Sequence, residues 1–427
     1  MRRSSLTSLL VVALACGDAP VSLDRDPGTT GSGTSAADTL ASTGEDPPPL
    51  DGPPICAPEC SAILTPTWTY EGPSGSYNVV EMLRDADGSL WLGLQGSQGN
   101  VSLLRLSAAG ELAWAAAPGL PCDRCELSDI ALHSSGDVLL GATGHSNVGP
   151  DEVIVARFEV ATQTLAWVRT LALAAGESTF PRLGELAVLD DDHIVALRVD
   201  GFSEGEVLEV LDLTADGTLR RKSYMGAQPG SGGPWPPLVV RALTGEMVAA
   251  HAWWDDETER MVTTSSRLVP PYYSLVSQVQ LPLRLDDLAV DGVGRRLELA
   301  RSVGADTLTL VLTSRRSSDP ERWTTSLPIL TTSSSRPALA VGPDDQVYVA
   351  ARATPRAPPG LPATVTLEVA RWSPDGALGW RSARPVELMA TPDPLELVID
   401  DDHGVIVGTV VHGHVTVVRY EQTCTCE

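Results

Sequence analysis

A unit of about fifty residues recurs along most of the chain, and this repeat limits the fold more than any other feature. Its first half is an apolar strand, a polar tight turn and a second apolar strand, as in VVEMLRDADGSLWLGL from Val79. The turn residues follow one another at intervals of 48 to 58 residues: Gly88, Gly136, Asp192, Gly245, Gly294, Asp345 and His403. Such a period indicates a fold built from stacked copies of one small unit.

The second half of the unit is a third strand, a turn and a fourth strand that often carries tryptophan. Examples are LLRLSAAGELAW ending at Trp114, VARFEVATQTLAW ending at Trp167 and VARWSPDGALGW ending at Trp380; LEVLDLTADGTLR, ending at Arg220, lacks the tryptophan. Val- and Leu-rich runs split by Asp, Gly, Ser and Pro are typical of strands. Four strands per unit at this period predict an all-β protein, a seven-bladed β-propeller.

The two ends of the repeat region complement each other. The seventh unit ends with the strand from Val415 to Tyr420 and the tail EQTCTCE, so its fourth strand is missing. Before the first unit lies PTWTYEG, in which Trp68 is placed like Trp114. We therefore predict that the N-terminal strand completes the last blade and pairs its open edge. The fourth and fifth units are degenerate, which leaves six or eight blades, or a pair of two-sheet sandwiches, as alternatives.

The first fifteen residues have the pattern of a bacterial secretory signal. A basic start, MRR, is followed by an apolar stretch from Leu6 to Ala15, and Cys16 comes next. The run VALAC ending at Cys16 resembles a lipobox, although Ala13 stands where the commonest form has Leu. We predict a signal peptide over residues 1–15 and a lipid-modified Cys16 that anchors the protein to a membrane. An ordinary signal peptide with an incidental Cys16 is the alternative.

Residues 16–55 have the composition of a tether. They are rich in Gly, Ser, Thr, Asp and Pro and contain few large apolar side chains. Such a segment cannot bury enough surface to offset the entropy lost on ordering. We predict a disordered linker that holds the β-propeller, residues 56–427, away from the membrane. The predicted location is the bacterial cell envelope, most specifically the outer membrane, on its periplasmic side or at the cell surface.

Composition excludes two classes of partner. The 427 residues include 30 Lys and Arg against 55 Asp and Glu, a net charge of −25, which repels nucleic-acid phosphates and acidic lipid headgroups. Hydrophobic residues make up 43% of the chain, enough for a sizeable core. No apolar run of about twenty residues is found, so we predict membrane contact through the lipid anchor only.

The remaining cysteines form three close pairs. They are Cys56 and Cys60, Cys122 and Cys125, and Cys424 and Cys426. An even number in an exported chain predicts disulfides, and six cysteines allow fifteen connectivities. Cross-pairing of the first and third pairs would close the ring covalently, whereas Cys122 and Cys125 are expected to pair with each other. A redox CxxC motif and a zinc site are the functional alternatives for these cysteines.

Acidic turns and histidines are weak candidates for metal ligands. Asp85 and Asp87, like the runs of three Asp from residues 190 and 400, look like fragments of calcium loops, although Asp and Gly also suit a tight hairpin. His412 and His414 could form a metal pair, or lie in a solvated loop. We predict no cofactor, with calcium as the alternative.

A cluster of aromatic and acidic residues is a weak candidate for ligand binding. Trp235, Trp253, Trp254, Asp255 and Asp256 are expected in loops of the fourth blade. At the mouth of a propeller they could hold a sugar or a cationic group. Packing between blades is the alternative role for these tryptophans.

The units resemble bacterial β-propeller repeats of the quinoprotein-like (PQQ-like) class and similar lipoprotein propellers. The shared feature is Gly-x-Leu-x-Trp, seen from Gly110 to Trp114 and from Gly376 to Trp380. The resemblance covers about residues 63 to 427. Quinone-dependent members of that class need a vicinal disulfide and an acidic calcium-binding set, and this chain has no adjacent Cys-Cys. Relatives without cofactor, such as outer-membrane assembly lipoproteins, are scaffolds.

No catalytic residue can be assigned from local motifs. GxSxG, a P-loop, a Rossmann glycine fingerprint and HExxH are all absent from the sequence. We predict a monomeric module that binds an envelope protein or a small ligand through its interblade loops and the loops between second and third strands. The alternative is a hydrolase or lyase with a site in the central channel, which a convergent acid–base set would favour.

Overall fold

In the six repeats whose turn residue lies in the described part of the chain, the first tight turn folds through a residue in the left-handed backbone region. In the first unit the Gly88 N–H donates to the Asp85 carbonyl at 3.0 Å, and Gly88 has a φ of 81°. Asp192, Asp345 and His403 take the same place with φ between 57° and 61°. Gly adopts this region without steric cost, and Asp and His are among the few other residues enriched there. This requirement explains why Gly, Asp or His occurs at these six turns.

In the computed structural model the described residues all belong to the unit Asp51–Glu427. They are 60–74, 77–145, 151–171, 180–189, 192–202, 205–228, 238–241, 247–255, 260–269, 274–281, 284–303, 308–315, 323–329, 336–353, 366–385, 395–411 and 413–426. The predicted signal peptide, Cys16 and the predicted tether lie outside them. Within these ranges no helix is long and apolar enough to cross a membrane.

The described residues form 28 strands and no helix, which confirms the predicted all-β class. The strands make seven four-stranded sheets in which all pairs are antiparallel. Sheet 1 is β2 (Tyr77–Arg84), β3 (Leu90–Gly96), β4 (Val101–Leu106) and β5 (Leu112–Ala116). Sheet 2 is β6 (Arg124–Leu132), β7 (Val138–His145), β8 (Glu152–Glu159) and β9 (Thr164–Leu171). Sheet 3 is β10 (Phe180–Val188), β11 (Ile194–Phe202), β12 (Gly205–Leu213) and β13 (Leu219–Gln228).

The other four sheets follow the same order, except that the last takes its fourth strand from the N-terminal side. Sheet 4 is β14 (Leu238–Arg241), β15 (Met247–Asp255), β16 (Arg260–Val269) and β17 (Ser274–Leu281). Sheet 5 is β18 (Arg284–Val290), β19 (Arg296–Val303), β20 (Leu308–Arg315) and β21 (Trp323–Ile329). Sheet 6 is β22 (Ala338–Val341), β23 (Val347–Ala353), β24 (Thr366–Trp372) and β25 (Leu378–Pro385). Sheet 7 is β26 (Glu396–Ile399), β27 (Val405–Val411), β28 (His414–Cys426) and β1 (Cys60–Ser74).

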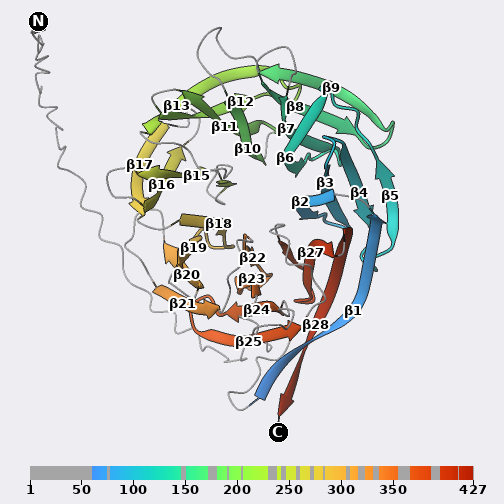
Figure 1. Ribbon diagram of the computed structural model, residues 1–427, viewed down its shortest axis with the longest axis vertical. Helices are drawn as coiled ribbons and strands as arrows, with labels where there is room; N and C mark the ends of the chain where they lie inside the picture. Colours follow the sequence, from blue (N-terminus) through green and yellow to red (C-terminus); the bar gives the residue numbers. More distant parts are fainter. Residues whose placement is uncertain are drawn as a thin grey trace, which may run out of the picture. The chain divides into compact units, whose positions relative to one another are not determined.

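The first strands of successive sheets are neighbours. Contacts join β2 to β6, β6 to β10, β10 to β14, β14 to β18, β18 to β22 and β22 to β26, and β26 contacts β2. In Figure 1 these strands lie on the inner side of the sheets, whereas strands such as β5, β9 and β25 lie on the outer side. Side chains from the first strands of different sheets are therefore placed close to one another.

A hydrophobic cluster lies between each pair of neighbouring sheets. In β3, Leu90 and Leu92 pack against sheet 7, while Trp91, between them in sequence, packs against sheet 2. Alternate residues of a strand point to opposite faces, so an apolar run serves two interfaces at once. This burial on both faces explains why the second strands of the repeat read as continuous apolar runs.

The first and last strands pair along most of their length. Trp68 is the backbone partner of Arg419 and Pro66 is the partner of Tyr420, in antiparallel register. In the same sheet, β28 also pairs with β27. The fourth strand of sheet 7 is therefore supplied by the N-terminal side of the described chain.

Tryptophans of the fourth strands pack on turn glycines of the next sheet. The pairs are Trp68 with Gly110, Trp167 with Gly217 and Trp323 with Gly376. A Cβ at any of these glycines would lie 2.4 to 2.7 Å from the indole ring. The glycine of the Gly-x-Leu-x-Trp pattern thus has a packing role, because Gly110 and Gly376 each meet a tryptophan of the preceding sheet.

Candidate functional site

One position on the first strands carries a carboxylate in five of the seven sheets. The position lies opposite the fourth residue of the second strand, as for Glu81 opposite Gly93. Its carboxylates are called the acidic ring: Glu81 on β2, Asp129 on β6, Glu185 on β10, Asp287 on β18 and Glu396 on β26. In β14 and β22 the same position holds Leu238 and Ala338. Because the first strands are neighbours, these residues come together from distant parts of the sequence.

Irregular strand pairing accompanies the acidic ring. The register of β2 against β3 shifts between Val79 and Glu81, and that of β6 against β7 shifts between Leu127 and Asp129. Shifts at matching places occur in β10 and β18. A bulge bends its strand and changes the direction of the side chain next to it. The bulges thus explain how a polar side chain can leave the packing pattern of a buried strand.

The acidic ring borders a cavity of about 250 Å³, called the central pocket. Its lining includes all five ring carboxylates, Arg336 and apolar residues such as Leu83 and Leu339. The side chains of Glu185, Asp287 and Arg336 keep 22 to 24% of their surface exposed. These groups are thus surrounded by protein but still border open space.

Arg336 is the cation that lines the central pocket within the described chain. Its Nη2 lies 3.6 Å from Glu185 Oε1 and 3.8 Å from Asp287 Oδ1. Its Nε–H donates to the Asp286 carbonyl at 2.6 Å, which fixes the guanidinium at one side of the pocket. One guanidinium therefore shares the lining of this cavity with five carboxyl groups.

Two members of the acidic ring also join neighbouring sheets. Asp129 Oδ2 accepts from the Leu186 N–H at 2.5 Å, and Asp287 Oδ2 accepts from the Leu339 N–H at 2.7 Å. Glu396 makes no hydrogen bond or ion pair with any other residue in the described ranges. Asp129 and Asp287 are thus bound to the backbone of the next sheet, whereas Glu396 interacts electrostatically with Glu81 and Arg336.

Burial and mutual repulsion raise the pKa values of three ring carboxyls and so favour their neutral forms. Burial first, then the charges of Glu185 and Asp287, raise the pKa of Glu81 to about 8. Burial and the charge of Glu81 raise the pKa values of Asp129 and Glu396 well above their usual range. Burial works against the charge of Arg336, but the carboxylates of Asp287 and Glu185 raise its pKa overall. At neutral pH the central pocket therefore holds protonated carboxyls next to a charged guanidinium.

This arrangement allows two kinds of chemistry. A cation that enters the central pocket would lower the pKa of the ring carboxyls and be held by the carboxylates it creates. A protonated carboxyl with a pKa near neutrality can also serve as a general acid. Both rest on the same carboxyl groups of the central pocket.

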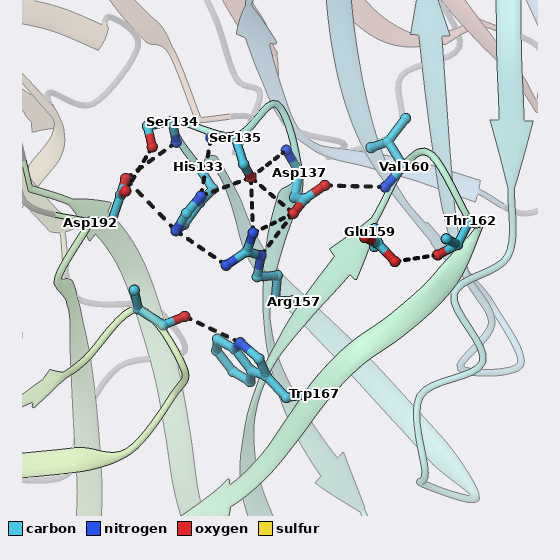
Figure 2. Close-up of polar contacts among 11 residues, drawn as sticks. His133, Ser134, Ser135, Asp137, Arg157, Glu159, Val160, Thr162, Trp167 and Asp192 are labelled. Atoms are coloured by element: carbon cyan, nitrogen blue, oxygen red, sulfur yellow. Dashed lines mark hydrogen bonds and ion pairs between the residues drawn. The ribbon is translucent and has the colours of Figure 1, made fainter.

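A second polar cluster lies at the turn between β6 and β7 (Figure 2). Ser135 Oγ lies 2.9 Å from His133 Nδ1 and donates to Asp137 Oδ2 or to that nitrogen, and His133 Nε2 lies 3.7 Å from Asp192 Oδ1. Arg157 donates through Nε to Asp137 at 2.8 Å and through Nη2 to Ser135 at 3.0 Å. Burial and the charge of Arg157 lower the pKa of His133, so its imidazole is neutral at pH 7.

The same arginine contact recurs in turns where Asp85 or Asp400 takes the place of His133, which indicates a structural role. In sheet 1, Arg105 on the third strand donates to Asp87 at 2.7 Å and to Ser89 Oγ at 2.9 Å. In sheet 7, Arg419 on the third strand donates to Asp400 at 2.6 Å. An arginine that ties the third strand to the first turn is thus a feature of the repeat. The serine–histidine contact in sheet 2 is explained by this turn geometry and is not assigned a catalytic role.

The candidates for metal binding do not form one group within the described chain. Asp85 and Asp87 face the guanidinium of Arg105, with Oδ2–Nη2 distances of 3.3 and 2.7 Å. His414 Nδ1 lies 3.5 Å from the Gly72 carbonyl, and His412 lies outside the described residues. No set of three or more His, Cys, Asp or Glu is arranged to hold a metal ion among the residues described.

The aromatic candidates lie partly in a strand. Trp253, Trp254 and Asp255 belong to β15 and pair with β16, so the predicted loop position of these three residues is wrong. Aromatic side chains favour extended, half-buried backbone, which explains why the strand continues to this point. Trp235 and Asp256 lie outside the described residues.

Cys122 and Cys125 form a disulfide with a Cα separation of 5.6 Å.

The acidic ring was missed by motif analysis, although the repeat carried a signal for it. The five strands read VVEMLRD, LSDIALH, LGELAVL, LDDLAVD and LELVIDD, with an acidic residue two or one places after the leading apolar residue. In a buried first strand a polar residue at a fixed place has no packing role, which marks it for attention. Alignment of the repeats against one another would have identified all five carboxylates.

Comparisons with known proteins identify the fold. No protein-family model and no curated protein matches the chain. The structure of the Dos1 propeller aligns with a TM-score of 0.50 and 10% identity, covering 84% of this chain and 95% of that chain. The structure of BBS1N in complex with ARL6DN, soaked with lead, aligns with a TM-score of 0.47 and 14% identity, covering 86% and 100%. At this level of identity the likeness to the Dos1 propeller shows the fold alone, and that fold is a β-propeller.

Proposed function

We propose that the seven sheets are the blades of a closed seven-bladed β-propeller whose last blade is completed by the N-terminal strand. Support comes from the contacts that run from β2 through β6, β10, β14, β18 and β22 to β26 and back to β2. The pairing of β1 with β28 supports the shared last blade. A ring of this kind places the acidic ring around one axis and so accounts for the central pocket.

The proposed location is the bacterial cell envelope, with the propeller anchored through a lipid on Cys16. The basic start, the apolar stretch and the VALAC run support this proposal, as does the Gly/Ser/Thr/Pro-rich composition of residues 16–55. A disulfide between Cys122 and Cys125 suits an oxidising compartment outside the cytosol. The propeller would then act as a scaffold held close to a membrane.

Intact-mass measurement of the protein expressed in a bacterium with its own leader tests the anchor. We expect a mature chain that begins at Cys16 and carries the added mass of a diacylglyceryl group. A Cys16→Ala variant should lose the lipid and leave the membrane fraction. An unmodified Cys16, or cleavage at another residue, would refute the anchor while leaving the propeller untouched.

We further propose that this propeller binds a small organic cation, or a cationic side chain of a partner, in the central pocket. The observation that carries the proposal is the excess of five carboxyls over the single guanidinium of Arg336 around an open space. A cavity of about 250 Å³ is smaller than the roughly 300–1,000 Å³ typical of drug-sized ligands, so the bound group is small. An amine fits better than a metal ion, because its N–H groups can reach separate carboxylates on different strands.

Titration calorimetry with 1,4-diaminobutane tests this function. We expect a dissociation constant below about 1 mM at pH 8 and an at least tenfold weaker one, about 1.4 kcal/mol, for Glu396→Gln. Affinity should fall as the pH is lowered from 8 to 6, because the cation must displace the proton that Glu81 holds with a pKa of about 8. The neutral analogue 1,4-butanediol and the exposed-site variant Glu152→Gln are the controls. Equal binding of the diamine and the diol would exclude the proposal.

A hydrolase or lyase with its site in the central pocket is the second candidate function. The specific observation in its favour is Glu81, a partly buried carboxyl that is protonated near neutral pH and lies among other acidic groups. Mass spectrometry of the diamine recovered after the titration separates the two candidates. A chemically unchanged ligand supports the binding module, whereas conversion by the wild type but not by Glu81→Gln supports the enzyme.

A further inference from the structure

The paired first and last strands bring their cysteines into register. Cys60 on β1 is the backbone partner of Cys426 on β28, and Ala62 is the partner of Cys424. Cys424 is disulfide-bonded and packs against the hydrophobic cluster between sheets 6 and 7. Cys424 is therefore covalently tied to another cysteine of the protein.

The choice of partner follows from elimination. Cys122 and Cys125 are bonded to each other, which leaves Cys56, Cys60 and Cys426 as partners for Cys424 within the predicted propeller. A bond between Cys424 and Cys426 would join alternate residues of one strand, whose Cα atoms lie about 6.6 Å apart, near the upper limit for a disulfide. Both other pairings of the four cysteines join the N-terminal side to β28.

Strand register selects one of those two pairings. Residues directly opposite each other in an antiparallel pair have Cα separations of about 4.5–5.5 Å, within the range of disulfides. Diagonal neighbours, such as Cys60 and Cys424, are about 7–8 Å apart, which is too far. Cys60 is thus matched to Cys426, and Cys424 is left for Cys56, which itself lies outside the described residues.

We propose that Cys60–Cys426 and Cys56–Cys424 are two disulfides that covalently lock the first strand to the last. In each, two thiols lose two electrons and two protons to a donor disulfide, which is reduced to two thiols. Each bond closes a loop of more than 360 residues, whereas Cys122–Cys125 closes a loop of four. In the chain-entropy model the long loops stabilise the fold far more than the short one.

These two disulfides, called the clasp, do not depend on the proposed ligand, but they require the proposed export to an oxidising compartment. In a reducing environment the contact between β1 and β28 would rest on backbone hydrogen bonds and packing alone. The clasp thus makes the stability of the last sheet depend on redox conditions. The central pocket, which includes Glu396 of that sheet, depends on them in turn.

Peptide mapping without reduction tests the clasp on full-length protein isolated from the periplasm. Cleavage after Glu59 separates Cys56 from Cys60. We expect the Cys60→Ser/Cys426→Ser variant to keep a Cys56–Cys424 link, and the Cys56→Ser/Cys424→Ser variant to keep a Cys60–Cys426 link. Links of Cys56 to Cys60, of Cys424 to Cys426, or of Cys60 to Cys424 in the wild type would overturn the proposal.

Thermal melting gives an independent readout with a matched control. Removal of all four clasp cysteines should lower the melting temperature by about 5 °C or more, and Cys122→Ser/Cys125→Ser by clearly less. Equal shifts would contradict the clasp. If all six cysteines of the wild type, including Cys122 and Cys125, are found reduced, the proposed export to an oxidising compartment is refuted. If Cys122 and Cys125 are the only oxidised pair, the proposed clasp is refuted.

Discussion

At pH 8 the Glu81→Gln protein should have a free energy of unfolding higher than that of the wild type by on the order of 3 kcal/mol. The native pKa of Glu81, about 8, lies far above its value of 4.5 in an unfolded chain. Between these values the native state holds a proton that the unfolded state has lost, so rising pH favours unfolding. The stability that Glu81 contributes is complete below about pH 4.5 and is lost as the pH rises through 8. Glutamine keeps the size and hydrogen-bonding groups of glutamic acid but cannot ionise.

Denaturant unfolding at pH 5 and at pH 8 measures this effect. The difference between Glu81→Gln and the wild type should be small at pH 5 and large at pH 8. The exposed Glu152→Gln variant, on β8, should show no such dependence. A Glu81→Gln protein that is less stable than the wild type at pH 8 would mean that Glu81 is a charged, satisfied part of the scaffold. The same variant is predicted to lose affinity for 1,4-diaminobutane, which would place the pocket among sites where stability is sacrificed for function.

Gly110→Ala should destabilise the protein by about 3 kcal/mol. Gly110 has a φ of 79°, a conformation that costs a residue with a Cβ about 1–2 kcal/mol. The new methyl group would also lie 2.4 Å from the ring of Trp68, which must move or strain its strand. Because Trp68 belongs to β1 and Gly110 precedes β5, the substitution acts on the contact between sheet 7 and sheet 1.

Gly136→Ala is the matched control for this experiment. Gly136 has a φ of 83°, but no atom lies within 4 Å of the place where its Cβ would be. It should therefore show only the backbone part of the effect, about 1–2 kcal/mol in the free energy of unfolding. Gly217→Ala and Gly376→Ala, which face Trp167 and Trp323, should resemble Gly110→Ala. Equal losses for Gly110→Ala and Gly136→Ala would mean that the tryptophan contacts contribute nothing to sheet packing.

Much of the fold could be predicted because each repeat carries its own local signals. The turn residues Gly88 and Asp192 mark places where the backbone must enter the left-handed region, whatever surrounds them. Apolar runs such as the one around Trp91 need burial on both faces, which only stacked sheets supply. The weakly repetitive fourth and fifth units still form four strands each, since backbone pairing tolerates loss of the sequence pattern.

The site could not be predicted in the same way because it depends on convergence. Glu81 and Glu396 are more than three hundred residues apart in sequence, and neither has a neighbouring residue that suggests chemistry. Their pKa values are raised only because other first strands bring further carboxyls and Arg336 to the same cavity. By contrast, the acidic turns attracted attention as metal candidates, but arginines such as Arg105 and Arg419 occupy two of them. Local density of acidic residues was thus a poorer guide than a fixed place in the repeat.

A crystal structure of the protein soaked with 1,4-diaminobutane at pH 8 tests the cation-binding account most directly. The account predicts an ammonium group in the central pocket, within about 2.7–3.2 Å of a carboxylate oxygen of Glu81 or Glu396. It also predicts that Arg336 keeps its hydrogen bond to the Asp286 carbonyl, because that contact holds it at one side of the pocket. A diamine bound only on the outer surface, with water alone among the ring carboxyls, would contradict the account.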